Sequence, residues 1–295
     1  MKASAECLPC VLRQIISTAR VAGADEETQR RIVVEGIKVL AEVDLNRSPA
    51  EVSFDCMKLT YELLGNDDPY RAQKAEQNRR ALAHCERLAN LVAESEDPLL
   101  TSLKLAAAGN IIDSGIQSGY NLDATLERIL ARPFGVDDYS LLRERLAVAK
   151  SVLYVADNAG EIVFDRLVIE RLGEVETTCV VRRSPVINDA TRDDARQAGI
   201  DRVARVIDPG VDSLGIPLAR CPAGFVGEFE RADLIISKGQ ANFETLEEYG
   251  SNERFSGKMF FVLMAKCDCV ARLLGAKTGD AVLKLACRDG YRHNE

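Results

Sequence analysis

Histidine is scarce in this sequence, and that scarcity excludes several kinds of active site. The 295 residues contain two histidines, His84 and His293, and the second lies close to the C-terminal end. A Ser-His-Asp triad, a histidine-rich zinc site and a histidine general base are therefore poor explanations for any activity of the chain. Acid–base or metal chemistry would have to use carboxylates, amides, lysines or cysteines.

Long apolar runs are also missing. The longest covers residues 259–265, far short of the roughly 20 residues that a membrane-spanning helix needs. The first residues are unlike a signal peptide, because Glu6, Pro9 and Arg13 interrupt any apolar segment. We therefore expect a cytoplasmic protein with no membrane partner, whose thiols stay mostly reduced.

The composition is that of an ordinary globular protein. Hydrophobic residues make up 46% and charged residues 28%, which excludes disorder and collagen-like repeats. The formal net charge is −8, so the chain lacks the basic surface with which proteins coat nucleic acid or anionic lipid. This balance still allows a phosphate ligand, because local cations or a bound metal can override the overall charge.

The first half of the sequence predicts helices only. Apolar residues recur at helical spacing, and Ser48, Pro49 and Glu51 supply a cap, a first-turn proline and the acid of a capping box. The helix that they start should end at Gly65. The expected helices cover residues 10–22, 26–43, 49–64, 70–93, 98–109, 122–131 and 139–148. We interpret residues 1–148 as a helical domain.

The second half changes to short apolar strands that alternate with helices. The expected strands cover residues 151–156, 177–181, 203–207, 234–237 and 259–264. Continuously apolar strands indicate a parallel sheet that helices cover on both faces. Residues 149–295 are therefore predicted to form a doubly wound, mostly parallel, Rossmann-like α/β/α domain, which makes the fold class α/β.

Oxygen-bearing side chains follow two of the expected strands. Asp157 and Asn158 come directly after the first strand, and Asp189 lies in the segment after the second. Ligands of open parallel sheets bind beyond the carboxyl ends of the strands, where these residues would meet. Such hard oxygen donors suit Mg²⁺ or Mn²⁺, with positions left for water and substrate phosphate. The same residue types are common in turns and helix caps, so that alternative stays open.

Cationic side chains follow other strands. Lys238 and then Asn242 come after the fourth strand, and Lys266 comes after the fifth. Lysines and an amide at strand ends can hold a phosphate, although the segment is not a Walker A loop and no G-x-G-x-x-G follows the first strand. Arg182 and Arg183 follow the second strand and are either surface charge or determinants of substrate choice.

Two further groups lie away from the strands. Asn110 and Asp113, on one helix face, either make a helix–helix hydrogen bond or reach the site from the helical half. Cys7 and Cys10 form a C-x-x-C that, together with Cys267, could bind a soft metal at a second site. The alternative is that these cysteines are small buried hydrophobic residues.

Taken in order along the chain, these motifs resemble the signatures of the family once labelled domain of unknown function 89, whose members are described as metal-dependent damage-control phosphatases. The matching segments are Cys7-Leu8-Pro9-Cys10, Asp68-Pro69-Tyr70 with Lys74, Gly109-Asn110 with Asp113, Asp157-Asn158-Ala159-Gly160-Glu161, Asn188-Asp189-Ala190-Thr191, Lys238-Gly239-Gln240-Ala241-Asn242-Phe243-Glu244 and Lys266-Cys267. The N-terminal C-x-x-C is similar to that of the stand-alone prokaryotic branch. The chain departs from the family pattern at Cys267-Asp268-Cys269, where a proline and an aliphatic residue are expected.

The resemblance implies roles for these residues. Asp157, Asn158 and Asp189 would be the metal ligands, for Mg, Mn, Co or Ni. Lys238 and Lys266 would hold the substrate phosphate. The other substrate-side residues at family positions are Asn242, Asn110, Asp113 and Glu161. Catalysis would rest on Asp157, Asp189 and Lys238.

The resulting hypothesis is hydrolysis of phosphomonoesters of small metabolites, such as sugar or cofactor phosphates. One alternative is a carboxyl methyltransferase or nucleotide-binding module on the same fold, because the human relative of the family has been described as such a methyltransferase. Arg182 and Arg183 argue against it, since an adenosine pocket usually has an acidic residue at that strand end. The other alternative is a non-enzymatic protein that binds metal through its cysteines.

Overall fold

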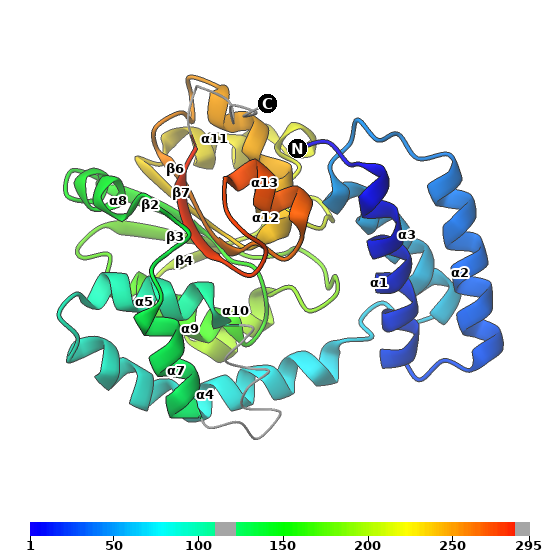
Figure 1. The fold of residues 1–295 in the computed structure, drawn as a ribbon, viewed down its shortest axis with the longest axis horizontal. Coiled ribbons are helices and arrows are strands. Elements are labelled where there is room, and N and C mark those ends of the chain that lie inside the picture. The colour runs from blue at the N-terminus through cyan, green and yellow to red at the C-terminus, as the bar shows by residue number, and fades with distance from the viewer. Residues whose placement is uncertain (110–121, 287–295) are drawn as a thin grey trace.

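Residues 1–109 and 122–286 are described by the computed structural model of the chain. Within them, seven strands form one sheet in the order β1-β7-β6-β5-β2-β3-β4 (Figure 1). The strands are β1 Val136–Asp137, β2 Ser151–Val155, β3 Glu176–Val180, β4 Arg205–Ile207, β5 Leu234–Lys238, β6 Met259–Met264 and β7 Ala281–Leu285. Strands β4, β3, β2, β5 and β6 are parallel, whereas β7 is antiparallel to β6 and parallel to β1. The predicted α/β class with a mostly parallel sheet is confirmed.

The strand order creates a switch point between β2 and β5. The chain continues from β2 to β3 and β4 on one side, and from β5 to β6 on the other. The loops that follow β2 and β5 therefore diverge and leave a crevice beyond the strand ends. Val155 of β2 pairs with Val180 of β3 and with Ser237 of β5, so the loops after these three strands begin side by side.

The sequence pattern did not indicate β1 or β7. β1 has two residues, too few to show any periodicity. In β7, Lys284 interrupts a short apolar run, while Val282 and Leu283 are buried on opposite faces of the sheet. Both strands lie at the edge of the sheet beyond β6, away from β2 and β3.

The N-terminal segment forms a bundle of three helices beside the sheet domain (Figure 1). The helices are α1 Leu8–Val21, α2 Glu26–Ala41 and α3 Pro49–Leu64, and the 3-10 turn η1 Ala5–Cys7 precedes them. Ile15, Ile32 and Met57 are buried in a core that belongs to this bundle. The predicted start of α3 is confirmed, because the Ser48 hydroxyl accepts a hydrogen bond from the backbone N–H of Glu51.

The remaining helices cover the two faces of the sheet. One face carries α4 Arg71–Ala93, α5 Pro98–Ala107, α7 Leu122–Ala131, α8 Tyr139–Leu146, α9 Glu161–Ile169 and α10 Arg192–Ala198, and the other carries α11 Ala223–Arg231, α12 Gln240–Leu246 and α13 Asp268–Leu274. Short 3-10 segments connect some of them, at η2 Ile200–Arg202, η3 Leu218–Arg220 and η4 Glu247–Ser251. No helix in the described part of the chain is long and apolar enough to cross a bilayer.

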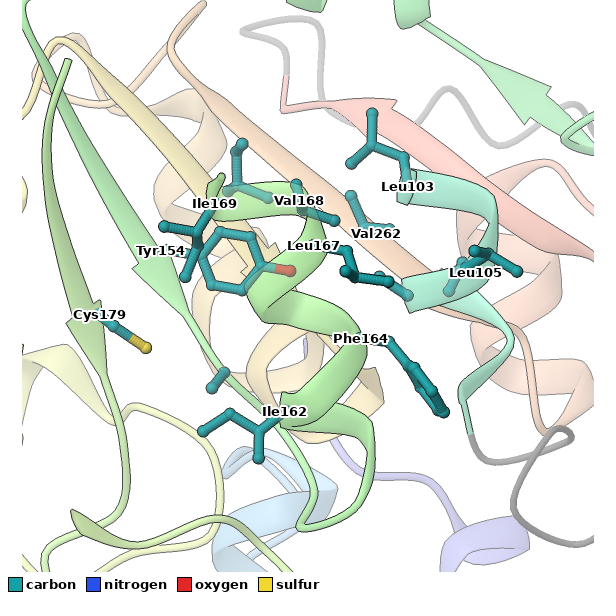
Figure 2. Close-up of a cluster of buried hydrophobic side chains, with 14 of the residues drawn as sticks. Leu103, Leu105, Tyr154, Ile162, Phe164, Leu167, Val168, Ile169, Cys179 and Val262 are labelled. Carbon is teal, nitrogen blue, oxygen red and sulfur yellow. The ribbon is translucent and has the colours of Figure 1, made fainter. Parts of the chain in front are cut away.

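Helices α4 and α5 share their core with the sheet. Figure 2 shows Tyr154 of β2 and Val262 of β6 in one cluster with Leu103 of α5 and Phe164 of α9. Leu88 of α4 belongs to the same cluster. The helices that follow α3 thus share the core of the sheet, and the predicted division at residue 148 stays a prediction.

Candidate active site

Three predicted site residues meet beyond the ends of β2 and β3. Asp157 and Asn158 directly follow β2, and Asp189 comes from the loop after β3. The backbone N–H of Ala190 donates a hydrogen bond to the carbonyl oxygen of Asp157 at 2.8 Å, and Asn158 pairs with Asp189 in an isolated antiparallel bridge. The two segments are thus joined through their backbones, which brings the three side chains to one place.

The two carboxylates are held by nitrogen donors on one oxygen each. The Asn158 amide donates to Oδ2 of Asp157 at 2.8 Å. The Arg182 guanidinium donates from Nε to Oδ2 of Asp189 at 2.6 Å, and its Nη2 lies 4.0 Å from Oδ1 of Asp157. Arg182 is therefore a buried counter-ion for both acids, which the sequence interpretation of a surface charge or a specificity residue did not foresee.

A glycine after β5 makes room for one of these carboxylates. Gly239 has φ +80°, and a Cβ built on it would lie 2.0 Å from Cγ of Asp157. Any side chain at this position would displace the Asp157 carboxylate or the backbone after β5. The Asp157 carboxylate therefore packs directly against the backbone that follows β5.

A cavity of about 680 Å³ opens at this edge of the sheet. Asp157, Asn158, Asp189 and Lys266 line it from the sheet domain. The N-terminal bundle supplies the facing wall, through Glu6, Cys7, Cys10, Gln14 and Ser53. The candidate metal ligands thus lie at one end of a space that is large enough for a small metabolite.

The two predicted phosphate lysines have different surroundings. The Lys238 ammonium is 1% exposed and donates to Oδ1 of Asp165 and to the carbonyl oxygen of Ala106, both at 2.9 Å. Lys266 is exposed. Both lysines line a small space of about 20 Å³ together with Asp157. Contact between either lysine and substrate stays a prediction, and Lys266 has the freer ammonium group.

Asn242 lies behind the carboxylates. Its amide nitrogen donates to the carbonyl oxygens of Ala156 and Lys238, at 3.0 and 2.6 Å, and its amide oxygen accepts from Arg182 at 2.8 Å. The side chain is fully buried. Its predicted contact with substrate stays a prediction; in the structure the amide supports Arg182.

Sequence reasoning missed the bridging role of Asn78, on α4. Its side-chain oxygen accepts a hydrogen bond from the backbone N–H of Gly160 at 2.7 Å, and its amide nitrogen donates to Oδ1 of Asp194 at 2.9 Å. Asp194 in turn accepts from the backbone N–H of Thr191. Asn78 therefore connects the loop that carries Asp157 to the loop that carries the second carboxylate.

Burial raises the pKa of two acids at the site. The pKa of Glu161 is raised to about 7, chiefly by burial, while Lys238 opposes the shift and Asp157 adds to it. The pKa of Asp189 is raised to about 6 by burial, with Arg182 opposing. Several acids are thus crowded in a poorly solvated place, and a divalent cation would relieve their repulsion.

The donor set fits a hard divalent cation. In residues 1–109 and 122–286, no three His, Cys, Asp or Glu side chains come together as a metal-binding group. The oxygens available at the site are those of two carboxylates, Asp157 and Asp189, and of the Asn158 amide. Mg²⁺ commonly keeps several waters and binds through one or two carboxylates plus substrate phosphate, so this small set is sufficient.

The predicted soft-metal cysteines line the same cavity. Cys7 and Cys10 come from the bundle, and Cys267 comes from the start of α13 together with Cys269. Gln240 donates to the sulfur of Cys267 at 3.7 Å. The eight cysteines among the described residues are free thiols. Cys7, Cys10 and Cys267 are exposed or partly exposed rather than fully buried, and a second metal site there stays a prediction.

Asn110 and Asp113 lie outside the described residues. The described chain ends just before them at Gly109, where an added Cβ would lie 2.5 Å from Cγ of Glu161. Gly109 itself therefore packs against Glu161. The predicted roles of Asn110 and Asp113 in substrate binding remain predictions.

Comparisons with known proteins agree over nearly the whole chain. The damage-control phosphatase ARMT1-like domain matches residues 3–282. A damage-control phosphatase of Pyrococcus horikoshii is 35% identical over 96% of this chain and 97% of the relative. A damage-control phosphatase of Archaeoglobus fulgidus is 34% identical over 97% and 99%. The crystal structure of a DUF89 family protein from Pyrococcus horikoshii superimposes with a TM-score of 0.84 at 32% identity, covering 97% of this chain and 99% of that one.

Proposed function

The chain belongs to the family of the damage-control phosphatase ARMT1-like domain and is a phosphatase, and on this premise we propose that it hydrolyses phosphomonoesters of small metabolites at the site around Asp157. Enzymes of this family are generally metal-dependent. We assign the cation to Asp157, Asn158 and Asp189. The observation that carries the assignment is that two carboxylates from different strand ends share Arg182 and open onto one cavity.

When bound, the divalent cation supplies charge neutralisation at the phosphate and alignment of the attacking group. The chain contributes the rest. Asp157 and Asp189 hold their carboxylates at fixed positions through the joined loops. Lys266 brings an exposed ammonium to the same space, where it stabilises charge on the transferring phosphoryl group. The buried ammonium of Lys238, which donates a hydrogen bond to Asp165, adds positive charge behind the site.

The facing wall favours a hydroxylated substrate over a nucleotide. Among the described residues that line the cavity, none is aromatic, so a base would find no ring to stack on. Gln14 and Ser53 instead offer an amide and a hydroxyl. We propose sugar phosphates as the main class, with cofactor phosphates of similar size as the second. The cytoplasmic location proposed from the sequence stays a prediction.

Oxygen ligands favour Mg²⁺ or Mn²⁺, with Co²⁺ and Ni²⁺ as further candidates. The test is a panel of sugar and cofactor phosphates, assayed with each of the four ions after treatment with EDTA. We expect no phosphate release without metal and the fastest release from sugar phosphates. Equal release with and without every ion would contradict the proposal. Hydrolysis in labelled water, followed by trapping of any phosphorylated protein, separates direct attack by water from a carboxylate intermediate.

A further inference from the structure

Arg182 has surroundings that surface charge does not explain. The side chain is 1% exposed and is among the largest fully buried side chains of the described chain. A buried guanidinium is tolerated only when other groups offset its charge and satisfy its donors. Here the offsetting groups are Asp189 and Asp157, the two proposed metal ligands.

The contacts of Arg182 connect the ends of three strands. Its own position follows β3, and its backbone N–H donates to the carbonyl oxygen of Ala190 at 2.8 Å. Its Nε reaches Asp189, also in the loop after β3, and its Nη2 reaches Asn242 on α12, which follows β5. Asn242 is itself fixed to the carbonyl oxygen of Ala156, directly before Asp157 at the end of β2. One path of hydrogen bonds therefore sets the second carboxylate relative to the first.

The geometry requires an arginine. Nε and Nη2 donate to two different residues, Asp189 and Asn242, from one rigid plane. A lysine ammonium is a single point charge on a flexible stem and cannot hold both acceptors in the same way. Nη1 is buried and has no hydrogen-bond partner within the described residues. A buried donor without a partner lowers the stability of the folded protein, so its presence favours a functional reason.

We infer that Arg182 is a positioning residue for the metal site: it clamps Oδ2 of Asp189, leaves Oδ1 for the cation, and fixes this carboxylate relative to Asp157. The inference rests on the proposed function, because it takes the two acids as ligands. This positioning role differs from a general electrostatic role, because it requires the two donors in one plane, Nε and Nη2, and not only a positive charge. It also places no contact between Arg182 and substrate.

The test measures Mn²⁺ binding to the full-length protein by titration, without substrate. Arg182→Lys keeps the positive charge and removes the planar guanidinium with its two donors. We expect it to weaken Mn²⁺ binding by about tenfold or more and to lower kcat, as loss of ligand-supporting contacts usually does. Arg183→Lys is the matched control, because Arg183 is exposed and bonds the carbonyl oxygen of Gly210. Arg183→Lys should bind within about twofold of wild type. Wild-type affinity in Arg182→Lys would overturn the inference.

A double-mutant cycle that combines Arg182→Lys with Asp189→Asn separates a positioning role of Arg182 from a general structural one. If Arg182 acts through Asp189, then Arg182→Lys should change the weak Mn²⁺ affinity that remains in the Asp189→Asn background by less than about twofold. An undiminished effect there would contradict the inference.

Should Arg182→Lys fail to fold, Asn242→Ala removes the second anchor of the guanidinium and should weaken binding by about threefold or more. Unchanged binding in that variant would also contradict it.

The outcomes distinguish this inference from the proposed function. If the wild-type protein binds no Mn²⁺, or if Asp157→Asn binds it equally well, the assignment of the ligands fails. If the wild type binds and Asp157→Asn does not, while Arg182→Lys binds normally, only the role of Arg182 fails.

Discussion

The carboxylate of Asp157 occupies the space where a side chain of Gly239 would be. A Cβ on Gly239 would come within 2.0 Å of both Cγ and Oδ2 of Asp157. This contact joins the ends of β2 and β5 at the switch point of the sheet, where open α/β folds bind their ligands. The position of the first proposed metal ligand thus depends on the absence of a side chain on the neighbouring strand end.

Gly239→Ala should inactivate the enzyme. The variant must adopt a positive φ, which costs about 1–3 kcal/mol, and it must also move the Asp157 carboxylate. Gly173→Ala is the control, because Gly173 also has a positive φ but has no atom within 4 Å of an added Cβ. We expect both variants to lose stability in urea denaturation, and only Gly239→Ala to lose Mn²⁺ binding and phosphate release. Normal Mn²⁺ affinity in Gly239→Ala would show that the contact is unimportant for the site.

Asn78→Ala should loosen both ligand loops at once. It leaves the buried backbone N–H of Gly160 without a partner and removes the hydrogen bond to Oδ1 of Asp194, at a cost of about 1–3 kcal/mol in the free energy of unfolding. Asn90→Ala, at an exposed position of the same helix, serves as the comparison. Hydrogen exchange of the Gly160 amide, together with kcat, measures the effect. Equal exchange rates in the two variants would refute the bridging role.

Lys238 and Lys266 should respond differently to substitution by methionine. Lys238→Met leaves Asp165 buried without its cation, which should cost about 3–5 kcal/mol of stability. Lys266→Met removes an exposed charge beside the cavity and should leave stability unchanged while it lowers kcat/KM by roughly 10²-fold. Thermal unfolding measures the stability of both variants, and steady-state kinetics measures their kcat/KM. Loss of activity in Lys238→Met without loss of stability would mean that its ammonium serves the substrate directly.

Glu244 should make the stability depend on pH. Burial raises its pKa to about 7 from an ordinary value of 4.5, against the lowering effect of the Gln240 hydrogen bond. Because the folded state keeps a proton that the unfolded chain has lost, this contribution is complete below pH 4.5 and disappears as pH rises through about 7. At 1.36 kcal/mol per pKa unit, the loss amounts to roughly 3 kcal/mol.

Glu244→Gln removes this titration. In EDTA, the difference in unfolding free energy between wild type and Glu244→Gln should therefore shift in favour of the variant between pH 5 and pH 8. A difference that stays constant over that range would mean that the carboxyl does not hold its proton.

Much of the fold could be predicted because local signals agree with it. The cap at Ser48 and the apolar run of β6 are complete within a few residues, and both appear where the sequence predicts them. The meeting of the Asp157-Asn158 segment with the loop that carries Asp189 also followed from a general rule, since parallel strands end at one edge of the sheet.

The rest depends on contacts between distant segments. Arg182 gives no sign in the sequence that it is buried, because its partner Asn242 is remote along the chain and is brought near only by the strand order. In the same way, Asp165 on α9 accounts for the burial of Lys238. The sequence shows Asp165 only as an acid within a helical pattern and does not indicate that a lysine from β5 binds it. Periodicity predicts which elements form, whereas such pairs require the assembled sheet.

The central claim is that Asp157 and Asp189 hold one cation between them. It is tested most directly by counting Mn²⁺ ions bound to the wild type, Asp157→Asn, Asp189→Asn and the exposed control Asp193→Asn, with phosphate release measured on the same samples. We predict one tightly bound ion in the wild type and in Asp193→Asn, and neither tight binding nor activity in either of the other two variants. Retention of the tightly bound ion and of full activity in Asp157→Asn or in Asp189→Asn would contradict the account.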